Sequence, residues 1–126
     1  MSPKPAPNID LLIRTAIEHR QLLELHYKNR ERIVEPHDYG IHHGVVKLFG
    51  YQVGGSSSQK LPNWRWMETD QISDIELLNR AFPGGRPTSS GKHHTWDQLF
   101  IRVQPADKGH LAMRRAGITR ELPKKP

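Results

Sequence analysis

The spacing of apolar residues changes near residue 21, which separates one expected helix from a series of expected strands. Apolar residues recur every three or four positions over 9–17, the pattern of a helix that buries one face. Asn8 is a typical helix N-cap, and Asp10 suits the positive end of the helix dipole. We therefore expect an extended arm over the Pro-rich residues 1–8, followed by a helix that ends near residues 19–21.

From residue 23 onward, apolar and polar residues alternate with the period of two that is typical of strands. Pro36 has no N–H to donate, so it is expected to end a strand or lie on a sheet edge. Tight turns are expected at Asn29-Arg30 and His43-Gly44. The expected strands cover residues 23–27, 31–35, 37–42, 45–53 and 64–68, with 72–78 as a further strand after a bend at Thr69-Asp70. This pattern predicts a mainly β fold, a small β-barrel of about five strands preceded by one α-helix.

The last third of the chain has a different composition. Residues 83–91 are rich in Pro, Gly and Ser, as linkers are. Residues 96–103 form an apolar island that is expected to dock on the barrel as a strand or a helical turn. The following residues to 126 are expected to be loosely ordered, with a short helix over 110–116. The predicted organisation is an arm (1–8), a domain (9–82) and a basic C-terminal extension (83–126) that is partly ordered around 96–103.

The net charge of +6 lies entirely in that extension. Residues 1–82 contain ten basic and ten acidic residues, whereas residues 83–126 contain nine basic and three acidic ones. A basic extension on a neutral domain indicates contact with a polyanion, although a solvated extension without a partner has the same composition. Both interpretations stay open at this point.

Composition excludes several classes of protein. The chain has no cysteine, so disulfide scaffolds and thiolate zinc sites are excluded. It has no apolar run of the ~18–20 residues needed for a membrane helix, and its first residues lack the apolar region of a secretory signal. A cytoplasmic protein without membrane contact is expected.

Four segments within residues 9–82 carry a family resemblance. They are Leu23-Glu-Leu-His-Tyr27, Arg32-Ile-Val-Glu-Pro36, Gly44 with Val46-Lys47-Leu48 and Tyr51, and Arg65-Trp-Met-Glu-Thr-Asp-Gln-Ile72. In order and spacing they resemble a WYL domain, a small bacterial ligand-sensing barrel. The resemblance implies an Sm/SH3-like β-barrel with a pocket for nucleic acid or a nucleotide-like effector, in a regulatory role such as transcription regulation. Only eight residues precede the helix, so the chain resembles a stand-alone member without a helix-turn-helix.

The departures from the family pattern lie in the tripeptide and in the last strand. Val46-Lys47 replaces the Trp-Tyr of the tripeptide, and only Leu48 remains. Glu68 and Gln71 stand where the family commonly has arginines. The other motif positions match, namely Arg32, Pro36, Gly44, Tyr51, Arg65 and Asp70. An altered anion site is therefore expected.

Arg32 and Arg65 are the predicted phosphate-binding residues, because a guanidinium binds phosphate with two parallel hydrogen bonds. Lys47 adds a third charge if its strand faces the same side. The alternative is a set of exposed arginines paired with acidic neighbours, Glu31, Glu35 or Glu68. Trp64 and Trp66 share one strand face, where they either stack on bases or pack in the core.

No chemistry beyond binding is predicted. In the pairs His42-His43 and His93-His94, adjacent side chains point to opposite faces of a strand, which disfavours a metal site. No nucleophile elbow and no phosphate loop occur, so no catalytic residue and no cofactor are predicted. The sequence thus predicts a non-enzymatic domain that binds a nucleotide or single-stranded nucleic acid. The alternative is a protein-interaction or homodimerisation module that uses a strand edge or the apolar island at 96–101.

Overall fold

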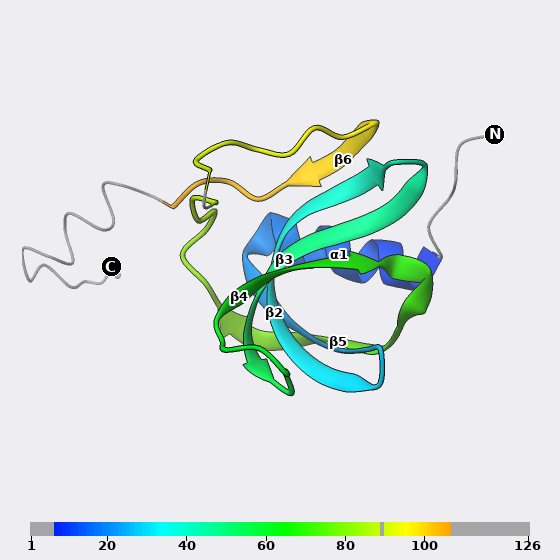
Figure 1. The fold of residues 1–126 in the computed structure, drawn as a ribbon, viewed down its shortest axis with the longest axis vertical. Helices are drawn as coiled ribbons and strands as arrows, with labels where there is room; N and C mark the ends of the chain where they lie inside the picture. Colours follow the sequence, from blue (N-terminus) through cyan, green and yellow to red (C-terminus); the bar gives the residue numbers. More distant parts are fainter. Residues whose placement is uncertain (1–6, 89, 107–126) are drawn as a thin grey trace, which may run out of the picture.

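The computed structural model describes residues 7–88 and 90–106, and Figure 1 shows their arrangement. This part of the chain contains one α-helix, six strands and a short 3₁₀ turn. The elements are α1 (Pro7–His19), β1 (Gln21–Tyr27), β2 (Arg30–His42), β3 (Val45–Gly55), β4 (Asn63–Glu68), η1 (Thr69–Gln71), β5 (Ile72–Ala81) and β6 (Gln98–Arg102).

All strand pairs are antiparallel, and the strands follow the order β4-β3-β2-β1-β5, with β6 also paired to β2. The sheet curls strongly (Figure 1), but its end strands β4 and β5 do not pair with each other in the described residues. The predicted mainly β fold with one leading helix is confirmed. The predicted barrel is a curled sheet that stays open.

Two tight hairpins connect the first three strands. Lys28 and Asn29 have φ angles of 52° and 62°, and His43 and Gly44 have φ angles of 51° and 76°. Two consecutive residues with positive φ are typical of the type I′ turns that match the twist of a hairpin. The turn at 43–44 is therefore as predicted, and the first turn lies one residue earlier than predicted.

Helix α1 provides one side of the hydrophobic core. Ile13, Ala16 and Ile17 are at most 1% exposed and belong to the core cluster. The helix begins at Pro7, where the missing N–H costs nothing because first-turn N–H groups have no helical partner. The prediction that residues 7 and 8 belong to an extended arm is therefore wrong, and residues 1–6 lie outside the described part. The sheet contributes fully buried side chains to the same core, among them Leu23, Val34, Tyr39, Leu48 and Met67.

Pro36 does not end a strand, so the first of its two predicted placements is wrong. Residues 30–42 form one continuous strand, in which Pro36 pairs with Gly50 and Asp38 pairs with Phe49. His37 is the extra residue of a β-bulge. Strand β1 pairs with β2 only up to Val34, and β6 begins to pair at Asp38. The proline thus lies where β2 exchanges one neighbour for another, a position that tolerates the missing N–H.

Part of the C-terminal extension belongs to the same fold. Its apolar island forms strand β6, the first of the two predicted alternatives, and Phe100 packs edge-on against Tyr39 at a centroid distance of 5.2 Å. The N–H of Val103 donates to the carbonyl of His37 at 2.8 Å. The helix predicted over 110–116 lies outside the described residues.

Helix α1 is the one α-helix of the described residues, and it was compared with the requirements for a membrane-spanning helix. Neither its length nor its hydropathy is that of a helix that crosses a bilayer.

Candidate anion-binding site

Arg32 and Arg65 converge on one side chain. Nη1 of Arg32 and Nε of Arg65 each donate a hydrogen bond of 3.0 Å to Oε1 of Gln52. The three residues come from the neighbouring strands β2, β3 and β4, and each points to the concave face of the curled sheet that also carries Leu48 and Met67. The two arginines singled out by sequence are therefore brought together, as the anion-site hypothesis requires.

Gln52 is held in one orientation by the loop after β3. Its side chain is fully buried, and its Nε2 donates to the carbonyl oxygens of Gly54 and Ser56, both at 3.0 Å. Because the amide nitrogen is fixed on that side, the amide oxygen faces the arginines. Gln52 was missed by sequence reasoning. A polar residue at an inward position of an otherwise apolar strand was the available signal.

The loop also supplies partners for the remaining nitrogens of Arg65. Nη1 donates to Gln59 Oε1 and Nη2 to Ser57 Oγ, each at 2.6 Å. A third arginine, Arg30, reaches the same loop and donates to Ser56 Oγ at 3.1 Å. All of these acceptors are uncharged. We call Arg30, Arg32, Arg65 and Gln52 with this loop the arginine cluster.

The arginine cluster has no counter-charge in the described residues. Neither Arg32 nor Arg65 has a carboxylate oxygen within 4.0 Å there. Arg32 is only 7% exposed, and its pKa is lowered by burial first and then by the neighbouring charges of Arg65 and Arg30. A guanidinium stays protonated at any cellular pH, so Arg32 keeps its charge although both burial and the neighbouring arginines disfavour it. The predicted alternative, in which Glu31, Glu35 or Glu68 pairs these arginines, is not what the described residues show.

Lys47 does not join the arginine cluster, so this part of the prediction is wrong. Successive residues of a strand point to opposite faces, and Lys47 lies on the face of β3 opposite to Gln52. Its Nζ is 3.2 Å from His42 Nδ1 and 5.6 Å from the centroid of the Trp66 ring.

Trp64 and Trp66 lie on that outer face as well. Trp64 stacks on Phe49 with a centroid distance of 4.8 Å and an interplanar angle of 2°, and Trp66 stacks on His42 at 4.3 Å. Both tryptophans are half-buried and lie outside the hydrophobic core. Because Arg65 points to the opposite face between them, these rings and the arginine cluster do not form one continuous surface.

The remaining family-motif positions have mainly structural surroundings. Leu48 is fully buried in the core, Gly44 provides the positive φ of a hairpin turn, and Pro36 stands beside the bulge. Tyr51 lies on the outer face, where the Arg86 guanidinium is 4.8 Å from its ring centroid. Asp70 is exposed on η1.

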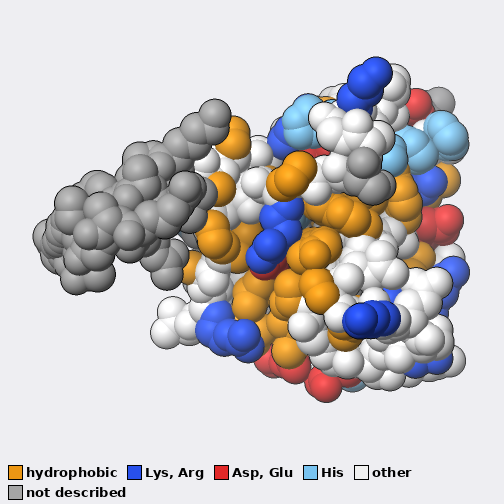
Figure 2. All heavy atoms as spheres, turned by 60° about the vertical axis from the view of Figure 1, so that its left-hand side comes forward, with side chains coloured by type: hydrophobic (Ala, Val, Ile, Leu, Met, Phe, Trp, Pro, Cys, Tyr) orange, Lys and Arg blue, Asp and Glu red, His pale blue; other side chains and the backbone are white. Residues whose placement is uncertain are grey.

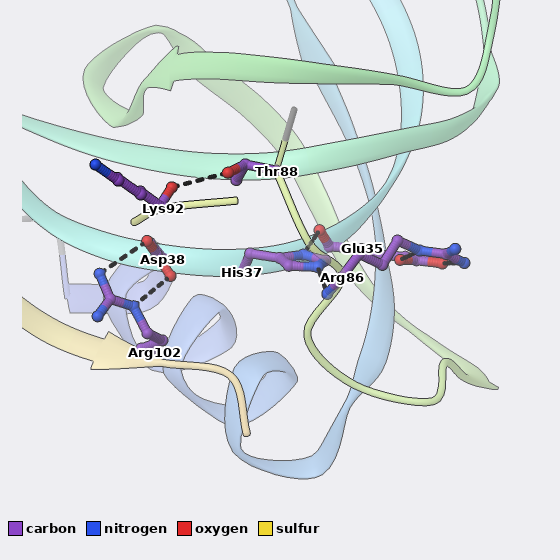
Figure 3. A network of polar contacts seen from close by, with 7 residues as sticks. All are labelled: Glu35, His37, Asp38, Arg86, Thr88, Lys92 and Arg102. Atoms are coloured by element: carbon purple, nitrogen blue, oxygen red, sulfur yellow. Dashed lines mark hydrogen bonds and ion pairs between the residues drawn. The ribbon is translucent and has the colours of Figure 1, made fainter. Parts of the chain in front are cut away.

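Two other arginines, in the extension, are each paired with a carboxylate (Figure 3). Nε and Nη2 of Arg86 donate to the two carboxylate oxygens of Glu35 at 2.6 and 2.8 Å. Arg102 binds Asp38 in the same bidentate manner at 3.0 and 3.2 Å. Glu35 and Asp38 are each 4% exposed. These arginines fasten the extension to β2 and are not free to bind an anion.

His37 lies between those two ion pairs. Its Nε2 accepts the N–H of Arg86 at 3.1 Å, so its Nδ1 must carry the proton that is shared with the carbonyl of Glu35 at 2.9 Å. Burial lowers the pKa of His37, which keeps the imidazole neutral. The His42-His43 pair stacks at 3.9 Å, and no group of three potential metal ligands occurs in residues 7–88 and 90–106.

Comparison of the chain with protein-family models, with curated proteins and with solved structures gave no match. The geometry of the arginine cluster therefore carries the functional argument.

Proposed function

We propose that this chain is a non-enzymatic, WYL-like regulatory domain that binds the phosphate of a nucleotide or of single-stranded nucleic acid at the arginine cluster. The observation that carries the proposal is the convergence of Arg32 and Arg65 on Gln52 Oε1 without a carboxylate partner in the described residues. Gathering like charges costs free energy, and an anion that binds there relieves that cost.

The chemistry of a phosphate suits this arrangement. A phosphate oxygen is a charged acceptor, so it replaces a neutral hydroxyl or amide oxygen as the partner of a guanidinium with a stronger hydrogen bond. The partners of the two Nη atoms of Arg65 are Ser57 and Gln59, which lie in the loop between β3 and β4. The basic extension adds non-specific attraction for a polyanion, although six of its nine basic residues lie in 107–126, outside the described residues.

An enzymatic function has no support in the described residues. One histidine and one carboxylate do meet, since His26 Nδ1 lies 2.9 Å from Asp74 Oδ2. Their side chains are 43% and 76% exposed, and no serine or threonine hydroxyl is hydrogen-bonded to this pair. Without a hydrogen-bonded nucleophile in the described residues and with free access of water, the pair is a solvent-exposed hydrogen bond.

One of the two surfaces of the interaction-module alternative, the apolar island, is contacted within the chain, whereas the outer edges of β4 and β5 have no strand partner in the described residues. The apolar island that was expected to dock on a partner is engaged within the chain, because β6 pairs with β2 and Trp96 packs on Trp66 at 5.4 Å.

Fluorescence anisotropy with a labelled single-stranded oligonucleotide, measured over a salt series, tests the proposal. Binding must weaken as salt rises, with a slope of roughly 0.7 per phosphate contact, because each contact releases counterions. Arg32→Gln and Arg65→Gln should each weaken binding and lower that slope by about one contact.

Arg80→Gln is the matched control. Arg80 is exposed on β5, so this variant removes one positive charge without touching the arginine cluster. If all three variants lower affinity equally, binding depends on net charge alone and the site assignment is wrong. A stable dimer in light scattering that ignores oligonucleotides and nucleotides would instead support the interaction module.

A further inference from the structure

A separate pocket lies between the outer face of the sheet and the extension. Its volume is about 260 Å³. One wall is aromatic and consists of His37, Phe49 and Trp64, and the centroid of the Trp64 ring lies 4.8 Å from those of the other two rings. Pro87 and Val103 from the extension also line this pocket. We call this space the extension pocket. Figure 2 shows the mixed character of one face of the molecule, with hydrophobic side chains around separate Lys and Arg side chains.

The charged groups that border the extension pocket are mostly neutralised. The Arg86–Glu35 and Arg102–Asp38 pairs are bidentate, and His37 is neutral because both of its ring nitrogens are engaged by backbone groups. The exception is Lys92 at the rim, which makes no ion pair in the described residues. The pocket is thus an aromatic surface with one positive charge at its edge.

The volume sets the size of the occupant. A cavity of about 150 Å³ accepts one benzene ring. The extension pocket therefore has room for a fused pair of aromatic rings with one small substituent. Among the three rings of this wall Trp64 is half-buried, whereas His37 and Phe49 are each 4% exposed. Stacking on Trp64 favours a flat molecule, and the Lys92 ammonium favours a negative substituent on it.

We propose that the extension pocket binds a small planar aromatic carboxylate. This site is independent of the arginine cluster, because Trp64 and Arg65 are neighbours on β4 and point to opposite faces of the strand. The proposal therefore stands or falls separately from phosphate binding.

Protein-detected NMR with the full chain and indole-3-carboxylate as the probe tests the proposal. We expect saturable shifts at the backbone amides of the pocket lining, including His37, Gly85 and Gly91. Trp64→Leu should weaken binding at least about tenfold, the size of effect expected for the loss of an aromatic stacking partner. Trp66→Leu is the matched control, since Trp66 lies on the same face of β4 and also contacts Phe49 at 4.6 Å but does not line the pocket. The Trp66→Leu variant should bind indole-3-carboxylate with an affinity within about twofold of that of the native chain.

Two further probes test separately what the aromatic ring and the carboxylate of the ligand contribute to affinity. Indole lacks the carboxylate and cyclohexanecarboxylate lacks the aromatic ring, so both should bind more weakly than indole-3-carboxylate. Lys92→Gln should reduce the affinity for indole-3-carboxylate to that for indole, whereas Arg80→Gln, at an exposed position on β5, should leave it unchanged. The proposal is overturned by the absence of saturable shifts at millimolar probe, by equal losses in the two tryptophan variants, or by cyclohexanecarboxylate binding as tightly as the aromatic acid. The dispersion of each variant's spectrum reports whether it is folded.

Discussion

Glu35 and Arg86 are 51 positions apart in the sequence, and the guanidinium of Arg86 binds both carboxylate oxygens of Glu35 at 2.6 and 2.8 Å. The Glu35 side chain is 5% exposed, whereas that of Arg86 is 42% exposed. The pKa of Arg86 is raised, chiefly by this hydrogen bonding to Glu35. The pair joins the middle of β2 to the start of the extension. Because Glu35 is buried and Arg86 is partly exposed, loss of the arginine leaves a buried carboxylate.

Arg86→Gln should destabilise the fold, because it leaves a buried carboxylate without a charged partner. We expect a loss of about 1–3 kcal/mol in the free energy of unfolding, below the usual cost for a fully buried pair because water reaches the arginine side. Urea unfolding measures this loss in the free energy of unfolding. Arg80→Gln, which removes an exposed arginine, should stay within about 0.5 kcal/mol of the native chain. Equal losses in the two variants would show that the Glu35 contact has no special role.

Stability should depend on pH through His37. The pKa of this buried, neutral histidine is lowered in the fold, so the unfolded chain takes up a proton first as the pH falls. The histidine's contribution is complete above the unfolded pKa of about 6.5 and is lost progressively below it, by at most about 1.4 kcal/mol per pH unit. Urea unfolding at a series of pH values measures this slope.

His37→Gln should flatten the slope below about pH 6.5, whatever its effect on stability at neutral pH. His42, whose pKa is also lowered, contributes in the same direction, so some dependence remains in this variant. His93→Gln in the exposed loop is the control. An unchanged slope in His37→Gln would contradict the assignment.

Gly40→Ala should dislodge β6. A Cβ atom at Gly40 would overlap the carbonyl oxygen of Gln98 and touch the backbone of Leu99, so the strand cannot stay in register. We expect a loss of about 1–3 kcal/mol, the usual cost of overpacking, and faster amide exchange over residues 98–103. At Gly85 the same atom would be 3.4 Å or more from every neighbour, so Gly85→Ala should cost much less. Native-like exchange in Gly40→Ala would contradict the close approach of β6.

Inorganic phosphate should stabilise the protein if the arginine cluster binds anions. At ten times its dissociation constant, a ligand that binds only the folded state adds about 1.4 kcal/mol. Thermal unfolding in phosphate, compared with chloride at equal ionic strength, measures this gain. Arg65→Gln should abolish the difference between the two salts, whereas Arg80→Gln should retain it. Equal stabilisation by both salts would indicate general screening.

The arginine cluster was only partly predictable. Arg32 and Arg65 were singled out by the resemblance to the WYL pattern, and the guanidinium chemistry made them suitable for phosphate. Gln52 and Ser57 were not found, since a neutral amide and a hydroxyl acquire their role only from the loop that folds over them. Lys47 was misplaced because the face of its strand depends on register, and a shift by one residue reverses every side chain.

The sequence by itself determined the helix, the hairpin turns and most strand positions, because apolar periodicity and turn residues act over neighbouring positions. Only the tertiary structure decided the neighbours of each strand. Strand β2 runs through Pro36 because β1 and β6 each pair with a different part of the same side of β2. The fold also brings Arg86 to Glu35, one of the carboxylates that the sequence had offered to Arg32 and Arg65, and brings Arg102 to Asp38. Such pairings depend on contacts between residues far apart in the chain, which no local pattern encodes.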